Sequence, residues 1–406
     1  MQKRRVVITG LGAITPLGNT VDEVWQNIVL AKSGIAPIRL VDGSTVKIPF
    51  TAEVKNYNPA DHFDEKLLEQ LDRFSQFALI AAREAIKDAG IKWDNELQYR
   101  TSVITGTGIG GQESMEKTFS DLYKENKSRP HSLSVPRIMP NAAASQISME
   151  FGIKGVCYTV ATACASSNHA IGNAFWMIRN GISDMAITGG SEAPISFGCL
   201  KAWEAIRVIS GDTCRPFSKN RSGMILGECG AMLVLELLDS ALQRNAKIYG
   251  EIVGLGMSAD AGHITRPSQE GAERAMQLAL KDADINPEKI DYINAHGTGT
   301  SANDVMEVAA IKNVFGEHAY RLAISSTKSM HGHALGGASA QEAVITAMAI
   351  KHQQLPPTAN FEVTDPECDL DVVPNQSRPA KIDYALSNAF AFGGLNAVIA
   401  FKKWEG

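Results

Sequence analysis

The sequence predicts an α/β protein in which one structural unit occurs twice. β-Branched runs that end in glycines alternate with longer helical patterns along the 406 residues, as expected when helices connect buried strands. The chain also resembles itself. Residues 5–12 (RVVITGLG) correspond to 250–256 (GEIVGLG), and residues 85–91 (AIKDAGI) correspond to 279–285 (ALKDADI). Because the corresponding segments follow in the same order, we expect a duplicated unit.

The elements of the first half follow from this pattern. A buried strand is expected at 6–9, and the helix that ends near Ile91 leads to a second strand at 103–105, which runs into glycines. Apolar residues at helical spacing over 171–178 predict a further helix. An apolar strand at 231–237 closes the half.

The second half is expected to repeat this order. We place the boundary so that the halves are residues 1–248 and 249–406. An apolar run from Ile293 ends in glycines, and a strand at 321–324 precedes a helix that contains Glu342. Since no Pro/Ser-rich linker separates the halves, we expect them to pack as one body.

Composition excludes several classes of protein. The chain is 44% hydrophobic and 20% charged, and 39 basic against 44 acidic side chains give a net charge of −5. A mildly acidic chain without Lys/Arg runs is not expected to bind nucleic acid or an anionic membrane. No segment approaches the roughly 20 apolar residues of a membrane span. Six cysteines without Cys-x-x-Cys spacing argue against a disulfide framework or structural zinc and favour a reducing, cytoplasmic location.

Two short segments resemble a signal peptide and a dinucleotide-binding motif, but we expect neither feature here. Basic residues at 3–5 before an apolar stretch resemble a signal peptide, but the stretch is short and runs into glycines, so a buried strand is expected. The sequence GTGIGG at 106–111 matches the dinucleotide pattern G-x-G-x-x-G. The acidic residue wanted about 20 positions later is not clearly present, so a tight turn is expected and no cofactor is predicted.

Cys164 is the first candidate for chemistry. It lies among small residues (ATACASS, 161–167) at the start of a helical pattern. The positive end of a helix dipole and unpaired N–H groups favour the thiolate, which is the nucleophilic form of cysteine. The small neighbours leave room for a substrate. A buried structural cysteine is the alternative.

Two histidine-containing turns follow in the second half. His296 lies in NAHGTGT, where a strand gives way to a glycine-rich turn, and catalytic groups collect at such strand ends in α/β folds. The segment STKSMHGH places Lys328, His331 and His333 at a strand-to-helix turn. Structural histidines are one alternative. A metal site at His331 and His333 is another, but no third ligand at a fixed spacing supports it, so no metal is expected.

The duplication predicts that these groups meet. If a pseudo-twofold axis relates the halves, the helix start that carries Cys164 and the helix start after His333 are equivalent and can face one pocket. His296, at the tip of a neighbouring strand, would lie beside them.

These motifs resemble the β-ketoacyl-acyl-carrier-protein synthases of the elongating I/II type, in the thiolase-like superfamily. The resemblance covers essentially the whole chain and is carried by four segments: TACAS around Cys164, NAHGTGT with Asn303 and Asp304, STKSMxGH ending at His333, and FAFGG at 390–394. It implies a duplicated thiolase-like fold of five layers (α-β-α-β-α) with two mixed sheets. It also implies a homodimer and a Cys-His-His triad.

The resemblance assigns a role to each matching residue. Cys164 takes the acyl chain from its carrier, and the backbone N–H groups of Cys164 and Phe392 form an oxyanion hole. His296 and His333 hold the malonyl thioester oxygen while carbon dioxide leaves, and the resulting enolate attacks the acyl-cysteine. Phe392 also resembles a gate between acyl pocket and malonyl site. Lys328, which is counted among the catalytic residues, and Glu342 match a pair that shapes the electrostatics near His333, and Asp304 and Glu307 match supporting polar positions.

Acyl-pocket and gate positions are matched by Ile109, Trp203, Phe390 and Ala391. The chain departs from the housekeeping pattern here: His331 and Leu395 each replace a usual Thr, Ala391 replaces a Gly, and Trp203 replaces a smaller aromatic. Ala391 lacks the freedom of Gly and Trp203 adds bulk. We therefore expect a short, unsaturated or aryl chain to be favoured over a long saturated one.

The partner that the resemblance implies is an acyl carrier protein, loaded with an acyl or a malonyl group. Because this carrier is acidic, docking is expected to use the basic residues Lys66, Arg129 and Arg207, with ordinary solvated side chains as the alternative. Glu69 and Gln70, where the housekeeping enzyme tends to be basic, indicate a dedicated carrier.

Three readings of the biological role stay open. One is housekeeping fatty-acid elongation, and another is a specialised aryl-polyene, polyketide or nodulation-type pathway. The third is a non-catalytic subunit of the chain-length-factor type, which would form a heterodimer with a related subunit and usually lacks the cysteine.

Overall fold

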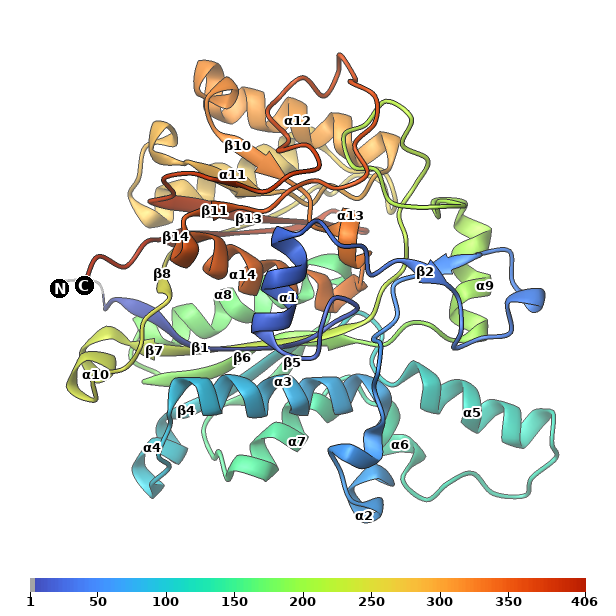
Figure 1. Ribbon diagram of the computed structural model, residues 1–406. Helices are drawn as coiled ribbons and strands as arrows, with labels where there is room; N and C mark the ends of the chain where they lie inside the picture. Colours follow the sequence, from blue (N-terminus) through green and yellow to red (C-terminus); the bar gives the residue numbers. More distant parts are fainter. Residues whose placement is uncertain (1–3) are drawn as a thin grey trace.

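The computed structural model describes residues 4–406, which fold around a ten-stranded mixed sheet (Figure 1). In spatial order the strands are β10 (Ala323–Ser325), β9 (Tyr292–Asn294), β13 (Tyr384–Ala391), β14 (Leu395–Lys402), β8 (Gly250–Ala259), β1 (Val6–Ile14), β7 (Cys229–Leu237), β6 (Met185–Glu192), β4 (Thr101–Gly106) and β5 (Cys157–Val160). Two small sheets pair β2 (Ala36–Pro37) with β3 (Phe50–Thr51), and β11 (Gln354–Leu355) with β12 (Arg378–Pro379). The predicted α/β class is confirmed.

The sheet has two arms with one topology. The N-terminal arm has the order β1-β7-β6-β4-β5, and the C-terminal arm has the order β8-β14-β13-β9-β10. In each arm the first three strands are antiparallel and the last three are parallel. The repeat in the sequence therefore corresponds to a repeat in strand order and direction.

The two arms are joined, which differs from the two separate sheets that we expected. β1 and β8 pair antiparallel over three residues each, Val6–Ile8 with Gly250–Ile252, so hydrogen bonds continue across all ten strands. Each of these strands would otherwise be the edge of its own arm. Pairing them satisfies backbone groups that a free edge would leave open.

The helices form layers on both sides of the arms. Figure 1 shows α8 (Ser166–Arg179) and α14 (Leu335–His352) between the arms, where they contact each other and strands of both. Helices α3 (Arg73–Ala89) and α7 (Ala142–Phe151) cover the outside of the N-terminal arm. Helix α11 (Gln269–Ala283), with α12 (Ser301–Phe315) against it, covers the outside of the C-terminal arm.

The remaining helices are short or lie at the periphery. They are α1 (Val21–Val29), α2 (Glu65–Leu68), α4 (Asn95–Arg100), α5 (Gln112–Tyr123), α6 (Ser134–Ile138), α9 (Phe197–Ile206), α10 (Leu238–Gln243) and α13 (Lys328–His331). Within residues 4–406, none of the helices has the length and apolar character needed to cross a lipid bilayer.

The repeated glycines explain the close packing of the outer helices. A Cβ at Gly12 in β1 would lie 1.9 Å from the backbone oxygen of Ala81 in α3, and a Cβ at Gly256 in β8 would lie 1.9 Å from that of Ala275 in α11. Both distances are shorter than any real contact, so only glycine fits. The corresponding G-L-G segments therefore set the same helix-on-strand approach in both halves.

Candidate active site

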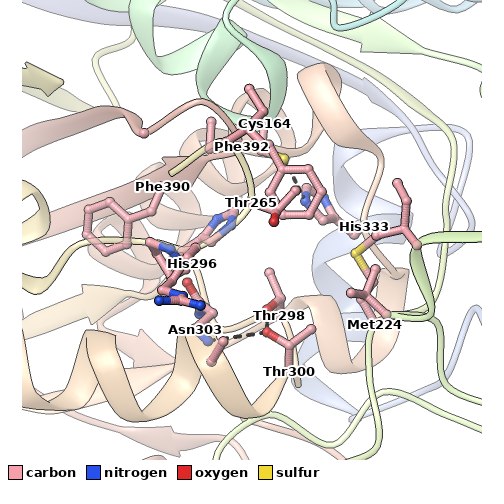
Figure 2. A pocket seen from close by; sticks show the side chains of 18 of the residues that line it. Cys164, Met224, Thr265, His296, Thr298, Thr300, Asn303, His333, Phe390 and Phe392 are labelled. Atoms are coloured by element: carbon pink, nitrogen blue, oxygen red, sulfur yellow. Dashed lines mark hydrogen bonds between the residues drawn. The ribbon is translucent and has the colours of Figure 1, made fainter. Parts of the chain in front are cut away.

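Cys164 lies where a sharp turn enters a central helix. It sits in the 3₁₀ turn Ala163–Ala165, which leads directly into α8. The preceding Ala163 has a φ of +49°, in the left-handed region that a residue with a Cβ rarely adopts. This strained turn presents the Cys164 side chain to a cavity of about 190 Å³ (Figure 2).

His296 and His333 line the same cavity. His333 Nε2 lies 3.1 Å from Cys164 Sγ. The imidazole rings of His296 and His333 stand at 84° to each other, with their centroids 5.5 Å apart. One ligand-type atom from each of the three side chains lies within 4.8 Å of the others, and all three residues are buried. The meeting predicted from the duplication is confirmed, because these residues come from the start of α8, the end of β9 and the residues before α14.

His331 points elsewhere. Its Nδ1 lies 2.7 Å from the Gly332 carbonyl oxygen, and its Nε2 lies 2.9 Å from Thr327 Oγ1. Burial and the Lys328 ammonium lower the pKa of His331 to about 3. The metal pair of His331 and His333 considered from the sequence is therefore not formed, and His331 is a neutral, structural histidine.

The Cys164 thiol differs from the expectation based on the helix dipole. Burial raises its pKa to about 11, although the Lys328 ammonium and the backbone N–H groups of Phe392 and Cys164 act in the opposite direction. The loss of hydration of the thiolate therefore changes the pKa of Cys164 more than the N–H groups at the start of the helix do. At neutral pH the resting side chain is thus a thiol, with His333 in reach of its proton.

Both active-site histidines are neutral at pH 7. Burial is the first cause and the Lys328 ammonium the second, and together they hold the pKa of His296 and His333 well below the usual value. Lys328 Nζ donates a hydrogen bond of 2.7 Å to the His296 carbonyl oxygen and a long one of 3.5 Å to His296 Nδ1. A donor at Nδ1 leaves the single ring proton of His296 on Nε2.

Lys328 is itself held in place by a buried carboxylate. It forms an ion pair with Glu342, which projects from α14. Burial raises the pKa of Glu342 to about 7, and Lys328 opposes this shift. The pair lies beneath His296 and so fixes a positive charge close to both imidazoles.

Glu307 and Asp304 act on the backbone rather than on the rings. Glu307 accepts hydrogen bonds of 2.8 Å from the N–H groups of His296 and Gly297. Asp304 accepts a hydrogen bond of 3.2 Å from the Gly299 N–H. Both carboxylates are buried, which raises their pKa values, that of Asp304 to about 6. They shape the glycine-rich turn that carries His296.

Models of one protein family match both halves of the chain. The description "Beta-ketoacyl synthase, N-terminal domain" matches residues 3–241, and "Beta-ketoacyl synthase, C-terminal domain" matches residues 249–362. The chain belongs to the β-ketoacyl synthase family.

Similar proteins from this family cover the chain from end to end. Nodulation protein E of Rhizobium sp. (strain N33) is 48% identical over 400 residues, which are 98% of this chain and 99% of that protein. The 3-oxoacyl-[acyl-carrier-protein] synthase 2 of Staphylococcus aureus (strain N315) is 44% identical over 411 residues, covering 100% of this chain and 99% of that one.

Solved structures of similar proteins have the same fold over their whole length. The ishigamide ketosynthase/chain length factor superposes with a TM-score of 0.95 at 36% identity, covering 99% of this chain and 100% of that one. A ketosynthase that was solved in complex with its type II PKS acyl-carrier protein superposes with a TM-score of 0.90 at 33% identity, with the same coverage.

In this β-ketoacyl synthase, aromatic residues form the wall beside Cys164. Phe392 stacks on Trp203 of α9, with ring centroids 6.0 Å apart and planes at 30°. Phe390 stands edge-on to His296 at 6.0 Å. Ala391 is buried in a small cluster with Cys164. Ile109 does not line the cavity itself but packs in the cluster behind it that includes Trp203.

The three predicted docking residues lie at different distances along the chain from the residues that line the cavity. Lys66, Arg129 and Arg207 are all exposed. Arg207 follows Ile206, which lines the cavity that holds Cys164, whereas Lys66 and Arg129 do not line it. Arg129 lines a separate hollow beside α5 and α6.

Several cavity residues were not singled out from the sequence. Thr298 and Thr300 lie across the cavity from Cys164 and contact each other at 2.9 Å through their hydroxyl oxygens (Figure 2). Arg266 lines the cavity from the segment before α11. The repeated Gly-Thr pattern directly after His296 indicated that the two threonines lie in the same turn as the histidine. No sequence signal pointed to Arg266. Its segment contacts the FAFGG turn, because the Gly393 N–H donates a hydrogen bond to the Ile264 carbonyl oxygen, 2.7 Å away.

The glycine-rich turn at 106–111 is closed by a protein carboxylate. Glu192 accepts hydrogen bonds from the N–H groups of Gly108 and Ile109 and from the Thr107 hydroxyl. It also accepts one from the Gly336 N–H, 3.0 Å away, at the start of α14. The N–H groups that a dinucleotide phosphate would need are therefore occupied, which explains why this pattern is a turn here.

Proposed function

We propose that this chain is a β-ketoacyl-acyl-carrier-protein synthase. It transfers an acyl group to Cys164 and condenses it with malonyl carrier protein, which gives a 3-oxoacyl carrier protein and carbon dioxide. The observation that supports this most strongly is the common cavity of one thiol and two neutral imidazoles. Incubation with acyl- and malonyl-loaded carrier, followed by mass spectrometry of the carrier, tests it. A carrier product heavier by the acyl group and lighter by carbon dioxide is expected.

In the first half-reaction the acyl group moves between two sulfurs. Cys164 Sγ attacks the thioester carbon, the bond from that carbon to the carrier sulfur breaks, and the thiol proton passes by way of His333 to the departing carrier thiolate. The backbone N–H groups of Cys164 and Phe392 are proposed to hold the developing oxyanion, each worth about 3 kcal/mol in the transition state. Both N–H groups already face the Cys164 sulfur, where they lower the pKa of the thiol.

In the second half-reaction a carbanion equivalent forms and attacks. His296 donates from Nε2 to the malonyl thioester oxygen, and His333 does so as well once its ring hydrogen lies on Nε2, the atom that acts as base in the first half-reaction. The thioester oxygen gains charge as the bond to the carboxylate carbon breaks and carbon dioxide leaves. The resulting enolate carbon attacks the acyl carbon on Cys164, the bond from that carbon to the cysteine sulfur breaks, and the departing thiolate takes up one proton from solvent to restore the thiol. Neutral imidazoles suit this role, because each carries one donor and no full charge has to be buried.

A specialised pathway is the proposed setting. The 48% identity to a nodulation protein E and the bulky Trp203 support it over housekeeping elongation. Cys164 in its cavity speaks against a non-catalytic chain-length-factor role. An acyl carrier protein is the proposed partner, together with a second copy of the chain or a related subunit. Two similar solved structures support this, a ketosynthase/chain length factor and a ketosynthase in complex with its acyl-carrier protein. Six unpaired cysteines fit a cytoplasmic location.

The duplicated strand order suits a two-part architecture. We assign residues 1–248 and 249–406 to two thiolase-like halves stacked in five layers. The matching strand order of the two arms and the family-model boundaries at 241 and 249 support this division.

The acyl selectivity is expected to depend on Trp203. Trp203→Phe removes bulk from the wall that faces Phe392 and so enlarges the space for the acyl chain. Transfer of palmitoyl relative to hexanoyl should rise by roughly tenfold, the lower end of the effect of one methylene in an apolar pocket. Rates of Cys164 acylation from hexanoyl, palmitoyl and aryl-primed carriers measure this. A parent enzyme that already prefers palmitoyl would contradict the assignment of Trp203 as a restricting wall.

Charge reversal at the cavity mouth should weaken carrier binding. Arg207→Glu is expected to raise the KM for carrier by roughly three- to tenfold at low salt and by less at high salt, because a rim charge steers association. Lys92→Glu, which reverses an exposed charge at a different hollow, is the matched control. An unchanged KM for Arg207→Glu at low salt would place the docking surface elsewhere.

A further inference from the structure

We infer that Glu116 is a positioning residue for acyl selection: it fixes the start of helix α9 and thereby the place of Trp203 in the cavity wall. The inference rests on the proposed condensing function. Glu116 lies on α5, about 80 residues before α9 in the chain, and does not line the cavity that holds Cys164.

Glu116 caps α9 from outside. Its Oε1 accepts hydrogen bonds from the Ser196 hydroxyl and from the Cys199 backbone N–H, the latter at 3.1 Å. Gln112, one turn earlier on α5, donates to the same oxygen at 3.1 Å and orients it. Ser196 makes no side-chain cap of its own, so the helix start depends on this carboxylate for its unpaired N–H groups.

The contact is close and charged. A Cβ at Gly198 would lie 2.9 Å from Glu116 Oε1, so the helix backbone lies directly against the carboxylate. Burial acts against ionisation of Glu116, but hydrogen bonds from Ser196 and Gly198 outweigh it and lower the pKa. A carboxylate at a helix N-terminus is also favoured by the helix dipole.

Beyond this cap, helix α9 is held by Leu200 in an apolar cluster and by Glu204, which accepts a hydrogen bond from the Lys47 backbone N–H. Only Cys199 and Leu200 of its ten residues are buried, and Phe197 at its start is 49% exposed. Because so few of its side chains are buried, the position of α9 depends strongly on its few polar contacts, above all those at its N-terminus. The N-terminal cap by Glu116 therefore matters more here than in a helix with a full apolar stripe.

Trp203 transmits this position to the active site. It lies between the capped start and the end of α9, lines the cavity with Ile206, and stacks on Phe392, whose backbone N–H acts on the Cys164 sulfur. A shift of α9 moves the Trp203 ring and alters the space beside the acyl chain. The two histidines come from other elements and keep their places.

Two substitutions at Glu116 distinguish the effect of its acceptor oxygen from the effect of its negative charge. Glu116→Ala removes the acceptor, and the ratio of palmitoyl to hexanoyl transfer should change by roughly tenfold, while Glu116→Gln keeps a carbonyl oxygen at the same position and should stay within about twofold of the parent. The KM for malonyl carrier should not change. Glu113→Ala, on the same helix but without a hydrogen bond to α9, is the matched control and should keep the parent ratio.

The measurements are acylation rates of Cys164 with both carriers, with thermal unfolding to check folding. Ser196→Ala removes a single donor and should shift the ratio in the same direction, which keeps the inference testable if Glu116→Ala does not fold. An unchanged ratio in these variants, or an equal loss with every carrier, would overturn the positioning role. A parent enzyme that forms neither acyl adduct nor 3-oxoacyl product would instead overturn the proposed function.

Discussion

Replacement of Cys164 by alanine is expected to abolish both acyl-enzyme formation and condensation, with the rate lowered by at least about 10³-fold, as for other covalent catalysts that lose their nucleophile. The reason is that Cys164 carries the acyl group between the half-reactions, and among residues 4–406 it is the one cysteine that lines the cavity beside His333. Intact-protein mass spectrometry after incubation with acyl carrier measures the adduct directly.

A second cysteine provides the control for this result. Cys157→Ala removes an exposed thiol at the edge strand β5 and should leave the adduct and the activity in place. An acyl adduct that persists in Cys164→Ala, or that maps to Cys157, would remove Cys164 from the nucleophilic role.

The proximity of the catalytic groups could be predicted from the sequence because it depends on repeated local features. Cys164 and His333 precede corresponding helices, α8 and α14, and the two arms repeat one strand order. A repeat of this kind carries positional information over more than 150 residues. The turn that holds His296 could be placed for the same reason, since it follows a strand.

The electrostatics of the site could not be predicted in the same way. The start of a helix at Cys164 is a local feature and favours the thiolate, but the pKa is raised to about 11 because many distant segments together remove water from the sulfur. The joining of the two arms through β1 and β8 likewise depends on how the halves dock.

Contacts between distant surface elements were also missed. Glu116 and Ser196 meet only because the tertiary fold brings the start of α9 within reach of one side chain of α5, and nothing in either segment indicates the other. The docking residues Lys66, Arg129 and Arg207 were chosen on charge alone, and they remain a prediction; of the three, Arg207 is the one next to residues of the cavity wall.

The two histidines are expected to separate the half-reactions when each is replaced. His296→Ala should lower carbon dioxide release by about 10²–10³-fold, the effect of losing one oxyanion donor, yet leave acylation of Cys164 nearly intact. His333→Ala should slow both steps, because its Nε2 also lies 3.1 Å from the Cys164 sulfur. Release of labelled carbon dioxide from malonyl carrier and the rate of adduct formation measure the two steps independently.

The pH dependence of decarboxylation and the control variant His331→Thr test the same assignment of His296 and His333. Because burial and the Lys328 ammonium keep the pKa of His296 and His333 well below the usual value, both rings are already neutral at pH 6, and decarboxylation should not rise between pH 6 and 8 through their deprotonation. His331→Thr, in the same segment but directed away from the cavity, should retain decarboxylation within about threefold, less than the loss of a direct oxyanion donor. If His331→Thr lost as much carbon dioxide release as His333→Ala, the pairing of His333 with His296 at the thioester oxygen would have to be abandoned.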